Sequence, residues 1–496
     1  MSPEATDPDG KTSASDDAGA APSLAIPNAR EIVLDNGLKA VLVERRGLPV
    51  VATALFYRVG SRDERTGESG LAHFLEHMMF KGTDRYAKGE IDLLTSKLGG
   101  SNNAFTDQDC TAYHFALASD RWETALEIEA NRMTSCALDP AEFAAEKQVV
   151  LEELAMGQDD PWNQLWQSTE ALTFQVHPYH RPIIGWREDL ERVSHETMRA
   201  FYRRHYGPNR AFLAVVGDID AKAAEKKVRA LFDGIAPVEE RGIVIAEPPF
   251  RGERRGIVRA PGTLSRVALA CRTCRVGERD DYALDVIAHV LALARSSRLH
   301  RRLVLEDELA TQVSAQNETR LDPGLFWVVA ELRPGVDPQR VEAVIREEVQ
   351  KLIEDGVTQA ELRRARIHIR SSFLFEDETV LDFAIKLGRY ETLSAAGWRL
   401  VDAVLPSYDA IDRRALRDTA ARLFPAEGWT AVWSVPADQP IARPTVRRAR
   451  KIATAAAKPQ RARVAAAAKG ELRGKRKAKA KGKAKGQVQA RRRGKR

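Results

Sequence analysis

The sequence predicts an α+β protein made of two homologous mixed αβ domains, with a disordered tail at each end. Three observations lead to this prediction. Segments of the two halves correspond at one constant offset along the chain, which indicates an internal duplication. In each half, a helical pattern is followed by a short loop with Pro and a strand-like run. Both ends of the 496-residue chain differ in composition from the rest.

The N-terminal segment, residues 1–28, is rich in Asp, Ser, Ala, Pro and Gly and is predicted to be disordered. It has no apolar stretch after a basic start, so as written it is not a secretory signal. No run of eighteen apolar residues predicts a membrane span. Four Cys in so long a chain agree with a reducing compartment. We expect a cytoplasmic location, or a periplasmic one if the start is misassigned.

The first predicted domain, residues 29–236, contains the sequence His-Phe-Leu-Glu-His at residues 73–77. On a helix, His73 and His77 share one face with Glu76 beside them, while apolar neighbours fall on the opposite face. Two His at i and i+4 can chelate one zinc ion. The order H-x-x-E-H is the inverted zincin signature, in which the Glu is a general base. The alternative is a pair of packing histidines beside a surface Glu.

A second helix in this domain is predicted to begin at Asp139, with Asp139 as N-cap, Pro140 in the first turn and Glu142 closing a capping box. A catalytic zinc site needs a third protein ligand. Three carboxylates on this helix are candidates: Glu146, Glu152 and Glu153. Spacing alone does not choose among them, and a solvated acidic helix face is the alternative.

The duplication rests on two pairs of segments. The helix start at residues 139–143 corresponds to residues 358–362, and the strand-like run at residues 211–216 corresponds to residues 430–435. A second copy of the domain is therefore predicted after the first.

We predict a linker at residues 237–254 and the second domain at residues 255–440. At the same offset, the positions of the metal-ligand candidates become Ala292, Ser296 and Ser372. None of these three side chains is a good zinc ligand. The second domain is therefore predicted to lack a metal site and to serve structure or substrate binding.

The C-terminal segment, residues 441–496, is a Lys/Arg/Ala-rich tail. From Arg443 to Arg496 it holds 22 Lys or Arg and a single acidic residue, Glu471, and no aromatic residue. Such a segment cannot bury a core, so disorder is predicted. It can bind nucleic acid or an anionic surface without sequence specificity, by counterion release. The alternatives are a solvated tail without a partner and contact with the acidic remainder of the chain.

Several motifs closely resemble those of the pitrilysin-type M16 zinc metallopeptidases, particularly the mitochondrial-processing-peptidase-like branch, M16B. The resemblance covers about residues 28–440 and implies the M16/LuxS-like metallohydrolase fold. The matching segments are residues 70–83, 99–106, 111–113, 149–154, 177–185, 206–209 and 216–218.

The resemblance implies a role for individual residues. By its distance from His77 along the chain, Glu153 corresponds to the third zinc ligand, and Glu146 corresponds to a carboxylate that supports the ligands. One Zn²⁺ per chain is expected, with Glu76 as the catalytic base. The segment after Gly99-Gly100 resembles an edge strand that pairs with an extended peptide substrate. Its expected substrate-binding residues are Asn103, Ala104, Phe105 and Thr106.

One departure from the family pattern bears on partners. Many M16 peptidases carry an Arg and a Tyr seven residues apart in the second domain, and this chain aligns Val304 and Thr311 with that pair. Val304 has no side-chain donor, and Thr311 is too short to replace Tyr. We therefore expect the zinc-bearing subunit of a heterodimer whose metal-free homologue supplies the pair, with a homodimer as alternative. The expected function is hydrolysis of short or unfolded polypeptides, and the alternatives are a non-catalytic assembly subunit and a polyanion-binding protein.

Overall fold

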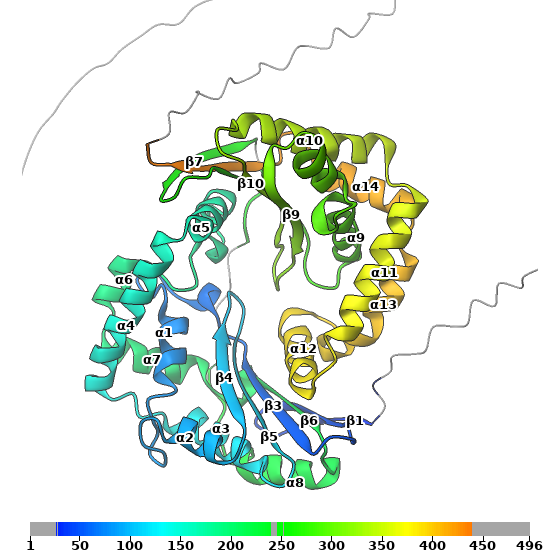
Figure 1. The fold of residues 1–496 in the computed structure, drawn as a ribbon. Helices are drawn as coiled ribbons and strands as arrows, with labels where there is room; N and C mark the ends of the chain where they lie inside the picture. Colours follow the sequence, from blue (N-terminus) through cyan, green and yellow to red (C-terminus); the bar gives the residue numbers. More distant parts are fainter. Residues whose placement is uncertain (1–25, 27, 240–245, 251, 439–496) are drawn as a thin grey trace, which may run out of the picture. The chain divides into compact units, whose positions relative to one another are not determined.

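The structure, a computed structural model, describes residues 26, 28–239, 246–250 and 252–438 and contains two β-sheets with their helices (Figure 1). The first sheet has the strand order β1-β2-β6-β3-β5-β4, and the second has the order β7-β11-β8-β10-β9. The strands are Ala29–Val33 (β1), Lys39–Glu44 (β2), Val50–Tyr57 (β3), Ser101–Thr106 (β4), Thr111–Ala118 (β5), Ala211–Gly217 (β6), Arg254–Ala260 (β7), Arg266–Arg272 (β8), Ala310–Glu318 (β9), Leu325–Leu332 (β10) and Thr430–Pro436 (β11).

Helices connect and cover these strands. The α-helices are Leu71–Met78 (α1), Glu90–Lys97 (α2), Glu123–Ser135 (α3), Pro140–Asp159 (α4), Pro161–Thr173 (α5), Arg187–Arg192 (α6), His195–His205 (α7), Ala221–Phe232 (α8), Arg279–Ala288 (α9), Pro338–Asp355 (α10), Gln359–Phe375 (α11), Val380–Leu393 (α12), Leu400–Ala410 (α13) and Arg413–Leu423 (α14). The 3-10 and π-helical segments are Ser61–Asp63 (η1), Pro178–His180 (η2), Pro208–Arg210 (η3), His289–Leu293 (η4), His300–Glu306 (η5) and Gly397–Arg399 (η6). No helix in the described ranges is long and apolar enough to cross a membrane.

The two sheets confirm the predicted duplication. Strands β2-β6-β3-β5-β4 of the first sheet occupy the same order as β7-β11-β8-β10-β9 of the second. The one parallel pair also recurs, since β2 runs parallel to β6 and β7 runs parallel to β11. Helices α4 and α11 begin at Pro140 and Gln359, two positions that correspond at the offset seen in the sequence. The fold is therefore two copies of one mixed αβ unit, as expected. Of the predicted tails and linker, residues 1–25, 27, 240–245, 251 and 441–496 lie outside the described residues.

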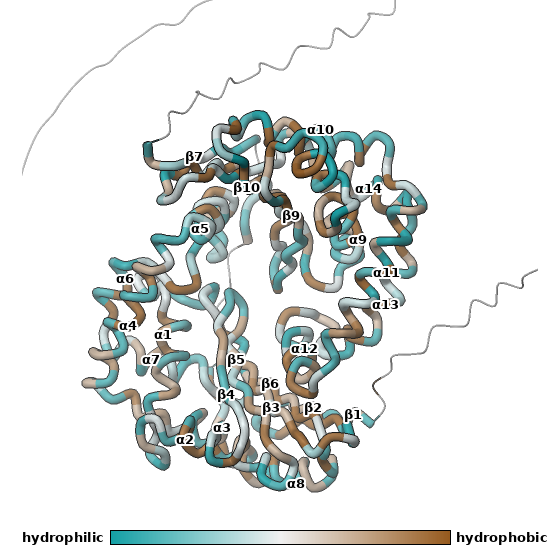
Figure 2. Tube along the Cα trace, viewed as in Figure 1, coloured by the Kyte–Doolittle hydropathy of each residue, from teal (hydrophilic) through white to brown (hydrophobic). Residues whose placement is uncertain are grey.

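One helix from each copy packs on the sheet of the other copy. Helix α5 belongs to the first half of the sequence but packs on β7, β8 and β11 of the second sheet. Helix α12 belongs to the second half but packs on β3 and β6 of the first sheet (Figure 1). The approach is close at two glycines. A Cβ at Gly388 of α12 would lie 2.0 Å from the ring of Phe56, and a Cβ at Gly256 of β7 would lie 2.6 Å from Leu172 of α5. Burial from both faces explains why β3 and β6 are almost wholly hydrophobic (Figure 2).

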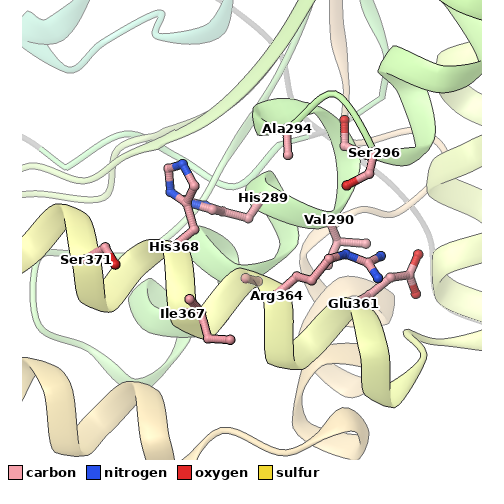
Figure 3. A pocket seen from close by; sticks show the side chains of 11 residues that line it. His289, Val290, Ala294, Ser296, Glu361, Arg364, Ile367, His368 and Ser371 are labelled. Carbon is pink, nitrogen blue, oxygen red and sulfur yellow. The ribbon is translucent and has the colours of Figure 1, made fainter.

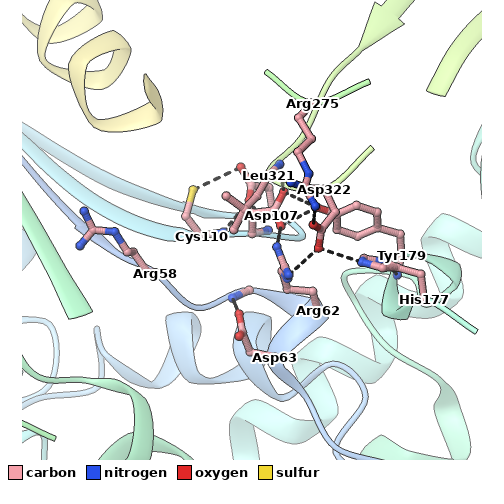
Figure 4. A network of polar contacts seen from close by, with 12 residues as sticks. Arg58, Arg62, Asp63, Asp107, Cys110, His177, Tyr179, Arg275, Leu321 and Asp322 are labelled. Atoms are coloured by element: carbon pink, nitrogen blue, oxygen red, sulfur yellow. Dashed lines mark hydrogen bonds and ion pairs between the residues drawn. The ribbon is translucent and has the colours of Figure 1, made fainter. Parts of the chain in front are cut away.

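A polar network also joins the two copies, at the loop between β9 and β10 (Figure 4). The carboxylate of Asp322 in this loop accepts hydrogen bonds from Arg62 at 2.7 Å and from Arg275 at 3.0 Å. Its Oδ2 also lies 3.1 Å from Nε2 of His177. The hydrogen bond to His177, together with the nearby Arg62, lowers the pKa of Asp322 to about 2. The ionised form of Asp322 therefore stabilises the junction.

Replacing Asp322 tests this junction. We expect Asp322→Asn to lower the free energy of unfolding at pH 7 by about 1–3 kcal/mol, because hydrogen bonds from charged donors are weakened. An Asp with a lowered folded-state pKa stabilises the fold above its ordinary pKa of 3.8 and loses this contribution as the pH falls toward 2. The difference between variant and wild type should therefore be smaller at pH 3 than at pH 7. Urea denaturation at both pH values measures it, with the exposed Asp159→Asn as control; equal differences at both would contradict the account.

Candidate metal centre

Helix α1 presents the predicted motif as expected. It buries Leu71, Phe74, Leu75 and Met78, so its apolar face packs into the core of the first copy. The side chains of His73 and His77 remain partly accessible, at 14% and 23% exposure. Their rings lie 4.7 Å apart between centroids. The helix therefore presents its polar face toward α4, which packs against it.

Helix α4 brings Glu153 to both histidines. Nε2 of His73 lies 3.8 Å from one carboxylate oxygen of Glu153, and Nε2 of His77 lies 3.6 Å from the other. Ligand atoms of the three residues all lie within 4.8 Å of one another, and no other group of three His, Cys, Asp or Glu in the described residues does so. Three ligands around one tetrahedral zinc ion are about 3.4 Å apart. The donor set therefore fits zinc with small side-chain adjustments.

Glu146 orients His77 from the opposite side. Its Oε1 lies 3.0 Å from Nδ1 of His77, and its Oε2 pairs with Nζ of Lys81 at 2.6 Å. Burial favours the neutral acid, but hydrogen bonds from Lys81 and His77 outweigh it and lower the pKa of Glu146. An ionised Glu146 accepts the Nδ1 proton of His77 and leaves Nε2 with a lone pair, as a metal ligand requires. Glu152, the third candidate by spacing, is exposed and outside this group.

The first turn of α4 differs from the prediction in one respect. Asp139 is the N-cap and accepts hydrogen bonds from the amides of Ala141 and Glu142. The capping box predicted for Glu142 does not form, because its carboxylate pairs instead with Nζ of Lys88 at 2.7 Å. The helix therefore begins where predicted, with a capping pattern changed by a tertiary ion pair.

Glu76 stands beside the three candidate ligands without joining them. Its Oε2 accepts a hydrogen bond from the hydroxyl of Thr106 at 2.5 Å, and burial raises the pKa of Glu76. Burial, with a smaller effect of neighbouring His77, lowers the pKa of His73 to about 4, so this imidazole is neutral. A neutral imidazole and a carboxylate held close to it are the two groups that metal-assisted hydrolysis needs at such a site.

The expected substrate strand is an edge strand. Asn103, Ala104, Phe105 and Thr106 all lie in β4, which ends the first sheet and, among the described strands, pairs with β5 alone. Thr106 connects the end of β4 to Glu76. The ring of Phe105 lies 4.8 Å from the guanidinium of Arg389, on helix α12 of the second copy. The open edge of β4 therefore runs up to Glu76, and Phe105 of the first copy and Arg389 of the second lie beside it.

The second copy has a pocket in the place of this group. In α11, Ala365 and Ser372 stand at the positions that correspond to Glu146 and Glu153. A pocket of about 370 Å³ opens between α11 and η4, where His289 Nε2 and His368 Nδ1 lie 3.0 Å apart (Figure 3). No third His, Cys, Asp or Glu joins them into a metal-binding group within the described ranges.

The positions that align with the family's Arg and Tyr lie in η5 and β9. Val304 is half-buried in η5, and Thr311 is exposed in β9. The hydroxyl of Thr311 donates to the backbone oxygen of Glu331 at 3.2 Å, or to its carboxylate at 3.1 Å. Thr311 therefore contacts its own sheet, and neither side chain offers the reach of Arg or Tyr.

A duplicated αβ fold with a His-His-Glu donor set on one copy is typical of metal-dependent peptidases. The chain belongs to peptidase family M16. The model described as "Insulinase (Peptidase family M16)" matches residues 39–186, and the model described as "Peptidase M16 inactive domain" matches residues 192–368. The first match lies within the first copy and contains His73, His77 and Glu153, and the second runs from the end of α6 in the first copy into α11 of the second.

Individual relatives agree with this assignment. The chain is 31% identical to the zinc protease PqqE of Helicobacter pylori, over 72% of this chain and 82% of the relative. It is 27% identical to the uncharacterized zinc protease YmxG of Bacillus subtilis, over 78% and 94%. The crystal structure of a protease from Helicobacter pylori matches with a TM-score of 0.79 at 28% identity, covering 83% of this chain and all of that one. A peptidase M16 inactive domain from Pseudomonas fluorescens, at 17% identity and a TM-score of 0.76, shares the fold.

Proposed function

We propose that this chain is a zinc-dependent endopeptidase subunit of the mitochondrial-processing-peptidase-like branch, which hydrolyses short or unfolded polypeptides. The observation that carries the proposal is the convergence of His73, His77 and Glu153 beside Glu76. Relatives named zinc proteases support the choice of metal. In this proposal the three residues hold one zinc ion, and Glu146 fixes the orientation of His77.

The chemistry follows from the residues beside the metal. A zinc ion held by His73, His77 and Glu153 would supply Lewis-acid chemistry, polarising the carbonyl of a scissile peptide bond and lowering the pKa of water. Glu76 then takes a proton from the attacking water as the new C–O bond forms, and delivers it to the amide nitrogen as the C–N bond breaks. The raised pKa of Glu76 suits a group that both accepts and returns a proton. Thr106 holds one oxygen of Glu76 and leaves the other for the water.

The open edge of β4 supports an extended substrate. A peptide strand paired with Asn103 to Thr106 makes main-chain hydrogen bonds that demand little of its sequence. Its path ends at Thr106, which touches Glu76, so pairing delivers a peptide bond to the base. Folded proteins do not offer a free strand, which is why we propose short or unfolded polypeptides as substrates.

The positions of Val304 and Thr311 support a partner. Because neither side chain can make the contacts of Arg and Tyr, we propose that a homologous metal-free M16 subunit supplies the pair. The test is cleavage of a quenched fluorogenic peptide library by the zinc-loaded chain, alone and with its closest metal-free homologue, with Glu76→Gln as blank. Hydrolysis in the mixture, absent with Glu76→Gln, is the expected result.

The other outcomes of this assay are equally decisive. Hydrolysis by the chain alone, unchanged by the homologue, would contradict the need for a partner while supporting the peptidase. No hydrolysis in either case would favour a non-catalytic assembly subunit.

Residues 443–496 lie outside the described structure, but their 22 basic side chains favour a second, separate role in polyanion binding. Truncation before Arg443 should abolish that binding and leave hydrolysis intact.

A further inference from the structure

A buried carboxylate from outside α1 caps the helix that carries the histidines. Glu64 follows the turn η1, and its side chain accepts hydrogen bonds from the backbone amides of Gly70 at 3.0 Å and Ala72 at 2.9 Å. Glu64 is only 4% exposed. The amides at a helix start have no partners within the helix, and a negative charge there also interacts favourably with the positive end of the helix dipole. Glu64 thus satisfies two amides of the first turn, the second of them directly before His73.

Both oxygens of Glu64 are used for this purpose. Oε2 binds the amide of Gly70 and Oε1 binds the amide of Ala72. Burial raises the pKa of Glu64, and the two amide donors offset this only in part. An N–H on each of the two oxygens is the arrangement that a carboxylate accepts best. No salt bridge involves this carboxylate within the described residues; Arg181 donates to the backbone oxygen of Glu64 instead. Both carboxyl oxygens of Glu64 are therefore used at the start of α1.

The backbone around Gly70 is fixed by a second contact. Gly70 and Gly185 both have φ of 89°, and a Cβ on Gly70 would lie 2.4 Å from the carbonyl oxygen of Ile184. A Cβ on Gly185 would lie 2.5 Å from Cα of Gly70. The motif at residues 177–185, which the proposed chemistry does not use, thus braces the start of α1 through Gly185 and holds Glu64 through Arg181.

The two histidines differ in how they are held. Nδ1 of His77 has Glu146 at 3.0 Å, whereas Nδ1 of His73 is buried and has no hydrogen-bond partner among the described residues. Zinc-binding histidines are usually oriented by a partner of their second nitrogen. His73 lacks such a partner here, so the position of its Nε2 depends on the backbone of the first turn of α1. That backbone is what Glu64 holds.

We propose that Glu64 is a positioning residue of the metal centre, which fixes His73 through the backbone of α1 as Glu146 fixes His77 through its ring. The inference rests on the proposed zinc site. Glu64→Gln keeps the size of the side chain, but its amide group turns an N–H toward one of the two backbone amides. Zinc affinity should therefore fall by about 10–100-fold, as for other residues that orient ligands. Glu64→Asp keeps the charge but is one methylene shorter, and should fall between Gln and wild type.

The experiment is competition for zinc between the full chain and a chromogenic chelator, with the thermal midpoint of the zinc-free protein measured in parallel. Glu68→Gln is the matched control, since Glu68 lies in the same loop but binds Arg204 at 2.7 Å and the amide of Arg65. A role in folding alone would lower the thermal midpoint without changing zinc affinity. The expected result is a raised zinc Kd for both Glu64 variants and an unchanged Kd for Glu68→Gln.

Three outcomes separate the claims. Unchanged zinc affinity in Glu64→Gln overturns the inference, and if that variant does not fold, unchanged affinity in Glu64→Asp does so. An equal loss in Glu68→Gln also overturns it, because the effect would then belong to the loop as a whole. Wild-type chain that binds no zinc would instead contradict the proposed metal site itself.

Discussion

Glu76→Gln should lower the rate of peptide hydrolysis by about 10²–10⁴-fold, the usual contribution of a general base. Glutamine has nearly the same shape and can still accept the hydrogen bond from Thr106, but it cannot take a proton from water. Glu76 is not among the three residues that converge as ligands. The variant should therefore bind one zinc ion per chain with unchanged affinity. Steady-state kinetics and zinc analysis on the same preparation measure both properties.

Glu142→Gln is a suitable control for this variant. Glu142 lies on α4 but pairs with Lys88 and is outside the group of converging ligand atoms. It should keep both hydrolysis and zinc. Loss of zinc from Glu76→Gln would mean that Glu76 is a ligand, and retained hydrolysis would assign the base to another residue.

Glu153→Gln should remove zinc from the chain. The amide is a much weaker zinc ligand than a carboxylate, and only two histidines would remain. Affinity should fall by more than the about 10–100-fold expected when a supporting residue such as Glu146 is changed. Chelator competition on wild type, Glu153→Gln and Glu146→Gln measures the order of the three dissociation constants.

Its matched control is Glu152→Gln, one residue earlier on the same helix. Glu152 is exposed and outside the group of converging ligand atoms. Zinc affinity should not change in this variant. A larger loss from Glu146→Gln than from Glu153→Gln would exchange the roles of the two residues.

Local sequence patterns predicted the elements that carry the site. The spacing of His73 and His77 among apolar residues indicated a helix, and Asp139 followed by Pro140 marked the start of α4. Both predictions depend on interactions within about one helical turn, where sequence and structure are directly coupled. The constant offset between the two halves indicated the second copy, because duplicated strands keep their order.

Contacts between distant segments could not be predicted in this way. Spacing left Glu146, Glu152 and Glu153 open, and the packing of α4 on α1 distinguishes them by the nitrogen that each carboxylate faces. The exchange of α5 and α12 between the copies has no signal in local periodicity. Glu64 was also missed, since its partners are backbone amides six and eight residues later. An acidic residue shortly before the glycine that begins a helix is the pattern that could have indicated it.

In the proposed metal site, His73, His77 and Glu153 hold one zinc ion. Anomalous diffraction at the zinc edge, from crystals of the zinc-loaded chain, tests it most directly. We expect one strong peak at about 2.0–2.2 Å from Nε2 of both histidines and from a carboxylate oxygen of Glu153. Absence of a peak there, or a peak only beside His289 and His368 in the second copy, would contradict it.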